Sequence, residues 1–332
     1  MERSIAAFIA AALFSILLTP LVISFAKKLK LRQTVLEYVD NHAAKSGTPT
    51  MGGIAFVLSA AAAFSVFTHG ENGMAFLCLI VTAGYGLVGF LDDFIKVRYR
   101  QNKGLSAWQK IIFQVAIAVC VSLYAYFSPV VGDKQFVPVS FYEFSLGIFA
   151  VPFYIAVFLA ASNAVNLIDG LDGLAAGVTK NYLICFSAMT ALAGSYAGVA
   201  FAASEQGANI TLFCMALAGA LCGFGVFNCY PAKIFMGDTG SLALGGALAC
   251  VSVVTKTVLV LPVMGIMYVF TALSVIIQVA VYKCTRKRVF LMSPVHHHYE
   301  RKGVHENRIV AVYSLITLLT GAALCFGILI FG

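Results

Sequence analysis

Ten apolar stretches, each long enough to cross a lipid bilayer as a helix, occupy most of the chain. A spanning helix needs about 20 predominantly apolar residues to cover the hydrocarbon core. The expected spans are residues 5–26, 51–68, 74–91, 108–128, 146–165, 174–194, 208–227, 239–255, 258–282 and 309–331. The sequence therefore predicts an all-α polytopic integral membrane protein with about ten transmembrane helices.

Composition supports one membrane domain over residues 1–332. Of the 332 residues, 61% are apolar and 11% are charged, whereas about 25% are charged in an ordinary soluble domain. The connections are too short for a separate soluble domain, and the first span is too long for a signal-peptide core, so we expect it to be retained. The nine cysteines occur singly without CxxC spacing, which favours packing roles over disulfides or zinc.

The positive charges predict how the chain is oriented. The connections at 27–50, 92–107, 163–173, 228–238 and 283–308, together with Lys110 at a span entry, hold 18 of the 22 Lys and Arg residues. Cytoplasmic loops carry such an excess. We therefore expect these connections in the cytoplasm, both termini outside, and a multi-pass protein of the bacterial cytoplasmic membrane.

Five aspartates lie at the expected cytoplasmic ends of several predicted spans: Asp92, Asp93, Asp169, Asp172 and Asp238. A charged group near lipid costs roughly 3 kcal/mol on the lenient insertion scale, so it needs a partner or a function. Any one of them could be a helix cap. Together, in Gly-rich apolar surroundings beside many cations, they indicate a site.

The segment GFLDDFIKVRYR places two carboxylates side by side, followed by three cations. Consecutive helical residues point about 100° apart, so Asp92 and Asp93 should have different roles. Lys96, Arg98 and Arg100 could anchor the helix at the membrane surface or bind phosphate beside a metal-holding carboxylate.

The segment NAVNLIDGLDGLAAG carries polar residues at intervals of three, which form one stripe while the helix lasts. The stripe consists of Asn163, Asn166, Asp169 and Asp172. Gly170 and Gly173 should end the helix, and Asp172 could instead cap the next one. A polar stripe on an apolar helix should line a cavity or another helix.

Three further segments carry polar residues. In MGDTGS, Asp238 enters a helix from a Gly-flanked turn, where Mg²⁺ and substrate phosphates could bind. In SPVHHHYE, Ser293 and Pro294 should be the N-cap and first residue of a short helix, with His296 to His298 in its first turn. Three successive side chains on a helix point in different directions, so these imidazoles are not expected to bind one zinc ion together. In HAAKSGTPTMGG, Lys45 lies beside glycines and could donate a hydrogen bond to a phosphate or a uracil carbonyl, or the segment could be a plain loop before a helix.

These five segments, in this order and nearly end to end, resemble the polyprenyl-phosphate N-acetylhexosamine phosphate transferases. Within that superfamily they are most similar to the phospho-N-acetylmuramoyl-pentapeptide transferases of peptidoglycan synthesis, through GTPTMGG, LDD, NLIDGLDGLA, MGDTGSLALGG and SPVHHHYE. The resemblance implies ten helices with an external N-terminus, a homodimer, a Mg²⁺ cofactor and a cytoplasmic site open to the bilayer.

The resemblance also implies site residues. The catalytic set is Asp92, Asp93, Asp238, His296 and His297, with Asp238 as the Mg²⁺ ligand and Asp92 as a second candidate. The substrate-binding set from the resemblance is Lys45, Asn163, Asp169, Asp172, Asn228 and Phe235, and the motifs add Lys96, Arg100 and Asn166. Departures are Ile168, Arg100 and Tyr299, where Thr, Lys and Phe are usual.

The implied reaction transfers phospho-N-acetylmuramoyl-pentapeptide from its UDP-linked form to undecaprenyl phosphate, giving lipid I and UMP for cell wall biogenesis, cell shape and cell division. Asp92 could act as base, as nucleophile or, as we favour, in positioning the lipid phosphate. Two alternatives stay open: a sibling transferase that uses UDP-N-acetylglucosamine, and an ion or proton transporter, since intramembrane carboxylates also mark ion pathways. No nucleic acid partner is expected.

Overall fold

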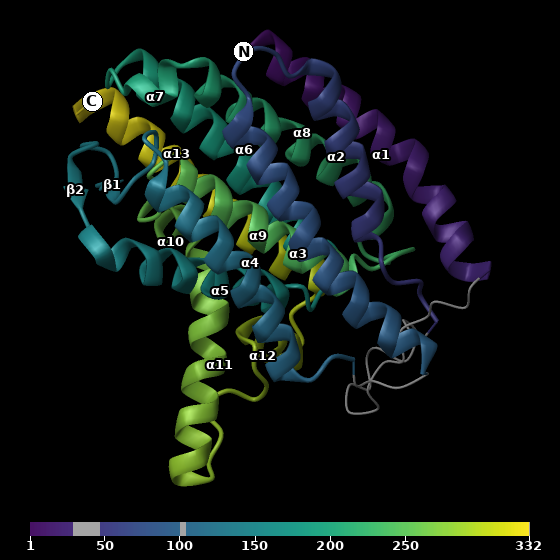
Figure 1. The fold of residues 1–332 in the computed structure, drawn as a ribbon. Coiled ribbons are helices and arrows are strands. Elements are labelled where there is room, and N and C mark those ends of the chain that lie inside the picture. The colour runs from purple at the N-terminus through teal and green to yellow at the C-terminus, as the bar shows by residue number, and fades with distance from the viewer. Residues whose placement is uncertain (29–46, 100–103, 332) are drawn as a thin grey trace.

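A computed structural model describes residues 1–28, 47–99 and 104–331, and the described chain is almost entirely helical (Figure 1). The long helices are α1 (Glu2–Lys28), α2 (Gly53–Phe67), α3 (Gly73–Arg98), α4 (Ala107–Phe127), α5 (Ala150–Ile168), α6 (Leu174–Ser195), α8 (Glu205–Asn228), α9 (Gly237–Val254), α11 (Ile266–Thr285) and α13 (Glu306–Phe331). The shorter elements are β1 (Lys134–Phe136), β2 (Glu143–Ser145), the 3₁₀ turn η2 (Gly147–Phe149), α7 (Ala200–Ala203), α10 (Val260–Met264) and α12 (Val295–Arg301).

Each of the ten predicted spans overlaps one or two of these helices, and the protein is an all-α polytopic membrane protein, as predicted. In the described residues, eight helices are long and apolar enough to cross a membrane, and the fourth of them is α5 counted together with the 3₁₀ turn that precedes it. Helix α2, with 15 residues, is apolar but shorter, and α6 is not among the eight. The largest boundary difference is in α3, which continues to Arg98, so that Asp92 and Asp93 lie on a helix.

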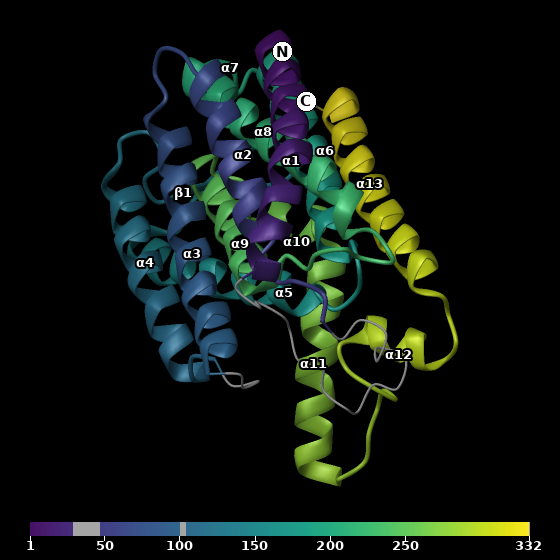
Figure 2. The ribbon, with the colours of Figure 1, turned by 90° about the vertical axis from the view of Figure 1, so that its right-hand side faces the viewer.

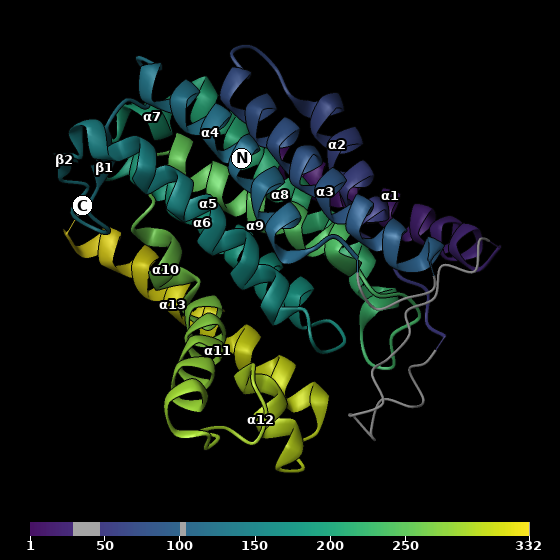
Figure 3. The same cartoon turned by 60° about the horizontal axis from the view of Figure 1, so that its bottom comes forward.

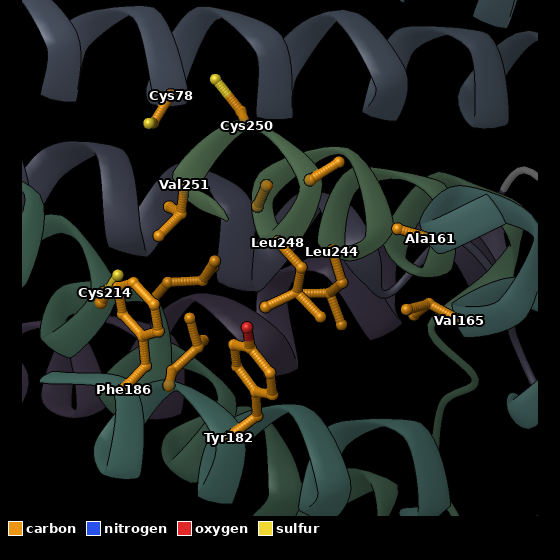
Figure 4. Close-up of a cluster of buried hydrophobic side chains, with 14 of the residues drawn as sticks. Cys78, Ala161, Val165, Tyr182, Phe186, Cys214, Leu244, Leu248, Cys250 and Val251 are labelled. Atoms are coloured by element: carbon orange, nitrogen blue, oxygen red, sulfur yellow. The ribbon is translucent and has the colours of Figure 1, made fainter. Parts of the chain in front are cut away.

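Helix α9 lies at the centre of the bundle and packs mainly against α3 and α5. Nearly all of its side chains are buried, because it is enclosed by helices rather than lipid. On one side, Leu244 and Leu248 point toward the ring of Tyr182 from α6 (Figure 4). Helix α8 packs against α1 and α6, and α13 packs against α6.

Two regions differ from the expected arrangement. The predicted span 258–282 is divided at Gly265, where α10 ends and α11 begins. A two-stranded antiparallel hairpin, with Lys134 opposite Ser145, connects α4 to α5 and was not predicted. Three-residue strands give too short an alternation to be recognised in a sequence.

The two termini lie at the same end of the bundle, while α11 projects beyond it at the other end (Figure 2). Figure 3 shows α12 beside the projecting part of α11. The apolar side chains of Ile276, Ile277 and Val279 on α11 are exposed, as expected for a helix that contacts lipid. Termini at one end agree with an even number of crossings; which end faces the cytoplasm stays a prediction.

Candidate active site

Two carboxylates and two ammonium groups form a compact cluster where α3, α4 and α9 meet. The Nζ of Lys96 lies 2.6 Å from Oδ2 of Asp92 and 2.9 Å from Oδ2 of Asp238. The Nζ of Lys110 lies 3.3 Å and 2.7 Å from the same two oxygens. The Asp92 side chain is 1% exposed and that of Asp238 is 16% exposed, so the carboxylates depend on these cations for compensation.

The local sequence explains how α3 and the start of α4 position Asp92, Lys96 and Lys110. Asp92 and Lys96 are one helical turn apart on α3, the spacing at which side chains on a helix meet. The backbone N–H of Leu105 donates to Oδ1 of Asp92 at 2.8 Å, which ties the start of α4 to α3. Ser106 then begins α4 in a capping box with Gln109, and this places Lys110 in the first turn.

Asp93 points to a different neighbour, as the 100° separation on the helix predicted. Its carboxylate accepts hydrogen bonds from the backbone N–H groups of Asp238 (3.2 Å) and Thr239 (2.9 Å) and from Oγ1 of Thr239 (2.7 Å). Asp93 thus caps the N-terminus of α9 from another helix. A side chain at Gly89, one turn earlier, would collide with the backbone of Asp238, so glycine permits this close contact.

The carboxylates suit a divalent metal ion. Oxygen atoms of Asp92, Asp93 and Asp238 all lie within 4.8 Å of one another. Because Asp93 is engaged by α9, the ligands that remain are Asp92 and Asp238, whose Oδ2 atoms already hold two cationic groups. The buried Oδ2 of Asp92 has ion-pair contacts but no hydrogen bond within the described residues, which leaves it capacity for a metal. The donor set therefore fits a small hard cation.

The polar stripe of α5 reaches the same cluster. The Nδ2 of Asn166 donates to Oδ1 of Asp238 at 2.7 Å and to the Ser241 hydroxyl at 2.8 Å. Asp169 follows the end of α5; burial, and then the nearby carboxylates of Asp238 and Asp93, raise the pKa of Asp169 well above its usual value. Asn166 therefore binds the cluster directly, while Asp169 is electrostatically coupled to it.

Asp172 does not cap the next helix, which corrects one alternative from the sequence. The N-cap of α6 is Gly173, in a left-handed conformation with φ 77°. The carboxylate of Asp172 instead accepts from the backbone N–H of Ala232 at 2.9 Å, and its own N–H donates to Glu306. Asp172 thus connects the α5–α6 turn to the loop before α9 and to the start of α13.

The histidine loop packs against the α5–α6 turn. A methyl group on Gly170 would lie 2.9 Å from Nε2 of His297 and would collide with His296. The His296 side chain is fully buried, and neither ring nitrogen has a hydrogen-bond partner in the part of the chain that the structure describes. Burial, and then the adjacent His297, lower the pKa of His296 to about 3, so it is neutral.

The start of α12 differs by one residue from the prediction. The N-cap is Pro294 rather than Ser293, and the N–H of Val295 donates to the hydroxyl of Ser274 on α11 at 3.0 Å. The cap is therefore supplied by another helix, which a local sequence pattern cannot indicate. Nδ1 of His297 lies within hydrogen-bond distance of Oε2 of Glu300, at 2.9 Å.

The segment TPTMGG lies beside the loop that leads to Asp238. The N–H of Phe235 donates to the carbonyl of Pro49, and the N–H of Gly52 donates to the carbonyl of Phe235, both at 2.9 Å. Buried Asn228 donates to the carbonyl of Ile234 at 2.9 Å and closes the turn after α8. Two predicted substrate-binding residues, Lys45 and Arg100, lie outside the described residues.

Lys110 is the main site residue that sequence reasoning did not identify. It was counted only as a positive charge at a span entry, yet it contacts both Asp92 and Asp238. One signal was available: a cation in the first turn of a helix is electrostatically unfavourable, so it suggests a nearby anion.

The comparisons agree with this geometry. Residues 74–256, from α3 to the end of α9, match the model described as glycosyl transferase family 4, and residues 45–57 match phospho-N-acetylmuramoyl-pentapeptide-transferase signature 1. The phospho-N-acetylmuramoyl-pentapeptide-transferase of Geobacillus thermodenitrificans is 45% identical over 315 residues, covering 92% of each chain. The chain belongs to the phospho-N-acetylmuramoyl-pentapeptide-transferase family.

Other members of this family align over similar lengths. The relative from Clostridioides difficile is 42% identical over 93% of this chain and 92% of its own, and that from Clostridium novyi is 38% identical over 96% and 95%. The family signature at 45–57 includes the segment that pairs with Phe235. The residues of the acidic cluster fall within the longer match, whereas the histidines of α12 lie outside both.

Proposed function

We propose that this protein transfers phospho-N-acetylmuramoyl-pentapeptide from UDP to undecaprenyl phosphate, with Mg²⁺ as cofactor. One observation carries the proposal: Lys96 and Lys110 share the carboxylate oxygens of Asp92 and Asp238 in a chain that is similar to such transferases over nearly its whole length. The cluster combines candidate metal ligands with cations that can bind phosphate.

In this reaction an oxygen of the lipid phosphate attacks the phosphorus that carries the sugar. A new P–O bond forms, the bond to the UMP oxygen breaks, and UMP leaves with the electron pair. Mg²⁺, held by Asp238 and Asp92, would neutralise phosphate charge. Lys96 and Lys110 are placed to bind the remaining phosphate oxygens, because they already lie beside the carboxylates that would hold the ion. Phosphoryl transfer depends chiefly on such positioning and charge stabilisation.

The contacts of Asp92 favour a positioning role over base catalysis. Its Oδ1 accepts from Leu105 and its Oδ2 lies beside two ammonium groups, so both oxygens hold neighbouring groups in place. A phosphate monoester has a second pKa of about 6, so roughly nine-tenths of it is already dianionic at pH 7. Removing the last proton would therefore gain little.

The Asp92→Asn rate between pH 6 and 9 separates these roles. If Asp92 positions groups, the deficit relative to the unmodified protein should be similar at every pH. A deficit that disappears at high pH, where the lipid phosphate is fully ionised, would establish Asp92 as the base.

The direct test is UMP release by the purified protein with polyprenyl phosphate, Mg²⁺ and UDP-N-acetylmuramoyl-pentapeptide. Activity should disappear with a chelator, return with Mg²⁺, and be absent in Asp238→Ala. Faster release from UDP-N-acetylglucosamine would favour the sibling transferase. Ion movement in liposomes without any nucleotide would favour a transporter, although the carboxylates gather at one end of the bundle rather than along a path through it.

Topology and assembly are part of the same proposal: an active site facing the cytoplasm, both termini outside, and a homodimer. Termini that lie together at the end opposite the projecting α11 support the first two points. Reporter fusions at each terminus would test the orientation, and light scattering of the purified protein would measure its oligomeric state.

A further inference from the structure

A buried polar group lies one helical turn deeper than the charged cluster, between α3, α4 and α5. Gln114 of α4 is fully buried, and its backbone carbonyl accepts a hydrogen bond from the hydroxyl of buried Tyr85 at 3.0 Å. Its side-chain Oε1 accepts from Nδ2 of Asn163 on α5 at 3.0 Å. This glutamine is four residues after Lys110, so both lie on the same face of α4.

The hydrogen bonds fix which way both amides point. The carbonyl of Leu159 can only accept, so the Asn163 group beside it, at 2.8 Å, must be the Nδ2 donor. The second hydrogen of Nδ2 then goes to Gln114, which must present Oε1. Both hydrogens of the Asn163 amide are therefore used, and only its Oδ1 is left to interact with something else.

This arrangement leaves a buried donor unsatisfied. The Nε2 of Gln114 has no hydrogen-bond partner within the described residues. An unpaired buried donor costs stability, and in a native protein it calls for an explanation. In return for this cost, the hydrogen bond from Asn163 to Gln114 helps to fix the orientation of the Asn163 amide. Asn163 is half-buried, and its Oδ1 accepts no hydrogen bond among the residues described.

Asn163, which carries this oxygen, borders an apolar cavity and precedes a residue of the charged cluster on α5. Asn163 is one turn before Asn166, which holds Asp238. It also lines a cavity of about 590 Å³ between α5, α9, α10 and α11, whose other lining side chains are almost all apolar. An acceptor at this border can bind a hydroxyl, an amide N–H or a metal-bound water, but it repels a bare phosphate oxygen.

We propose that Gln114 is a positioning residue for the transferase: together with the carbonyl of Leu159, it holds the Asn163 amide so that Oδ1 faces the substrates as an acceptor. This rests on the proposed function, because the readout is that reaction. A purely structural glutamine would act on folding and not through Asn163, so the two roles differ in a double-mutant cycle.

Three variants test the proposal by UMP release and thermal melting. Gln114→Met keeps the volume but removes the acceptor, and we expect kcat to fall about tenfold with little change in melting temperature. Gln114→Glu keeps an acceptor oxygen toward Asn163, and we expect it to retain activity within about threefold. Tyr85→Phe, which removes only the bond to the Gln114 backbone, is the matched control and should keep the original kcat.

The decisive comparison uses Asn163→Ala. If Gln114 acts through Asn163, adding Gln114→Met to Asn163→Ala should change kcat by less than twofold. Full activity of Gln114→Met, or losses that multiply in the double variant, would overturn the inference. If Gln114→Met does not fold, a tenfold loss in the folded Gln114→Glu would overturn it instead. Inactivity of the unmodified protein would refute the proposed function itself.

Discussion

Replacing Lys110 by glutamine should strengthen metal binding, because the lysine occupies the oxygen atom that a metal ion would use. Its Nζ lies 2.7 Å from Oδ2 of Asp238 and 3.3 Å from Oδ2 of Asp92. An ion that coordinates these oxygens must first displace the ammonium group. Glutamine keeps most of the side-chain length but removes the charge, so this competition is lost.

The magnitude follows from the hydrogen bond that the metal must break. A hydrogen bond between charged groups contributes about 1.5–3 kcal/mol. The lower end applies, because the Lys110 side chain is 19% exposed and Lys96 still competes. A gain of about 1.5 kcal/mol corresponds to roughly tenfold tighter binding.

Binding of Mn²⁺, followed by its electron paramagnetic resonance signal without nucleotide, measures this effect directly. Lys283→Gln is the matched control: it removes the same charge from the exposed end of α11 and should leave the affinity unchanged. Equal or weaker Mn²⁺ binding by Lys110→Gln would refute the reasoning. An equal gain in Mn²⁺ affinity in both variants would show that each substitution only relieved long-range repulsion between the metal ion and a lysine.

Two further predictions concern stability. Asp93→Ala should destabilise the protein by about 2–4 kcal/mol, because it leaves the N-terminal donors of α9 unsatisfied. Asp93→Asn keeps an acceptor and should therefore lose less stability. Thermal melting of the two variants measures this difference. His296 has a pKa of about 3 when folded and 6.5 when unfolded, so the unfolded state binds more protons between these values and stability falls as the pH falls. From pH 7 to 5 the loss of stability should approach about 2 kcal/mol. The melting temperature of His296→Gln should therefore depend less on pH than that of the unmodified protein. An unchanged pH dependence would contradict the assignment of this effect to His296.

The helices were predictable because burial in lipid leaves a strong local signal. Each span needs about 20 apolar residues, and this requirement located every long helix in the described part of the chain. The division at Gly265 was not predicted, because the apolar run continues through it and one glycine does not reveal a helix break. The extension of α3 to Arg98 was also missed, since charged residues were taken as the end of the span.

The site was predictable in its residue types but not in its pairings. The motifs identified Asp92, Asp93 and Asp238, yet only the packing of α3 against α9 shows that Asp93 caps α9 while Asp92 faces the lysines. Contacts between residues more than 100 positions apart, such as that of Lys110 with Asp238, depend on the tertiary arrangement. A single sequence without aligned relatives contains no direct record of such pairs.

Both ends of the chain lie at one end of the bundle, away from the projecting α11 and the histidine helix α12 (Figure 2). An affinity tag at either terminus would therefore attach the protein to a sensor surface with α11 and α12 directed into the solution. Inhibitors could then be screened against the immobilised enzyme without the support covering the end that carries α11 and α12.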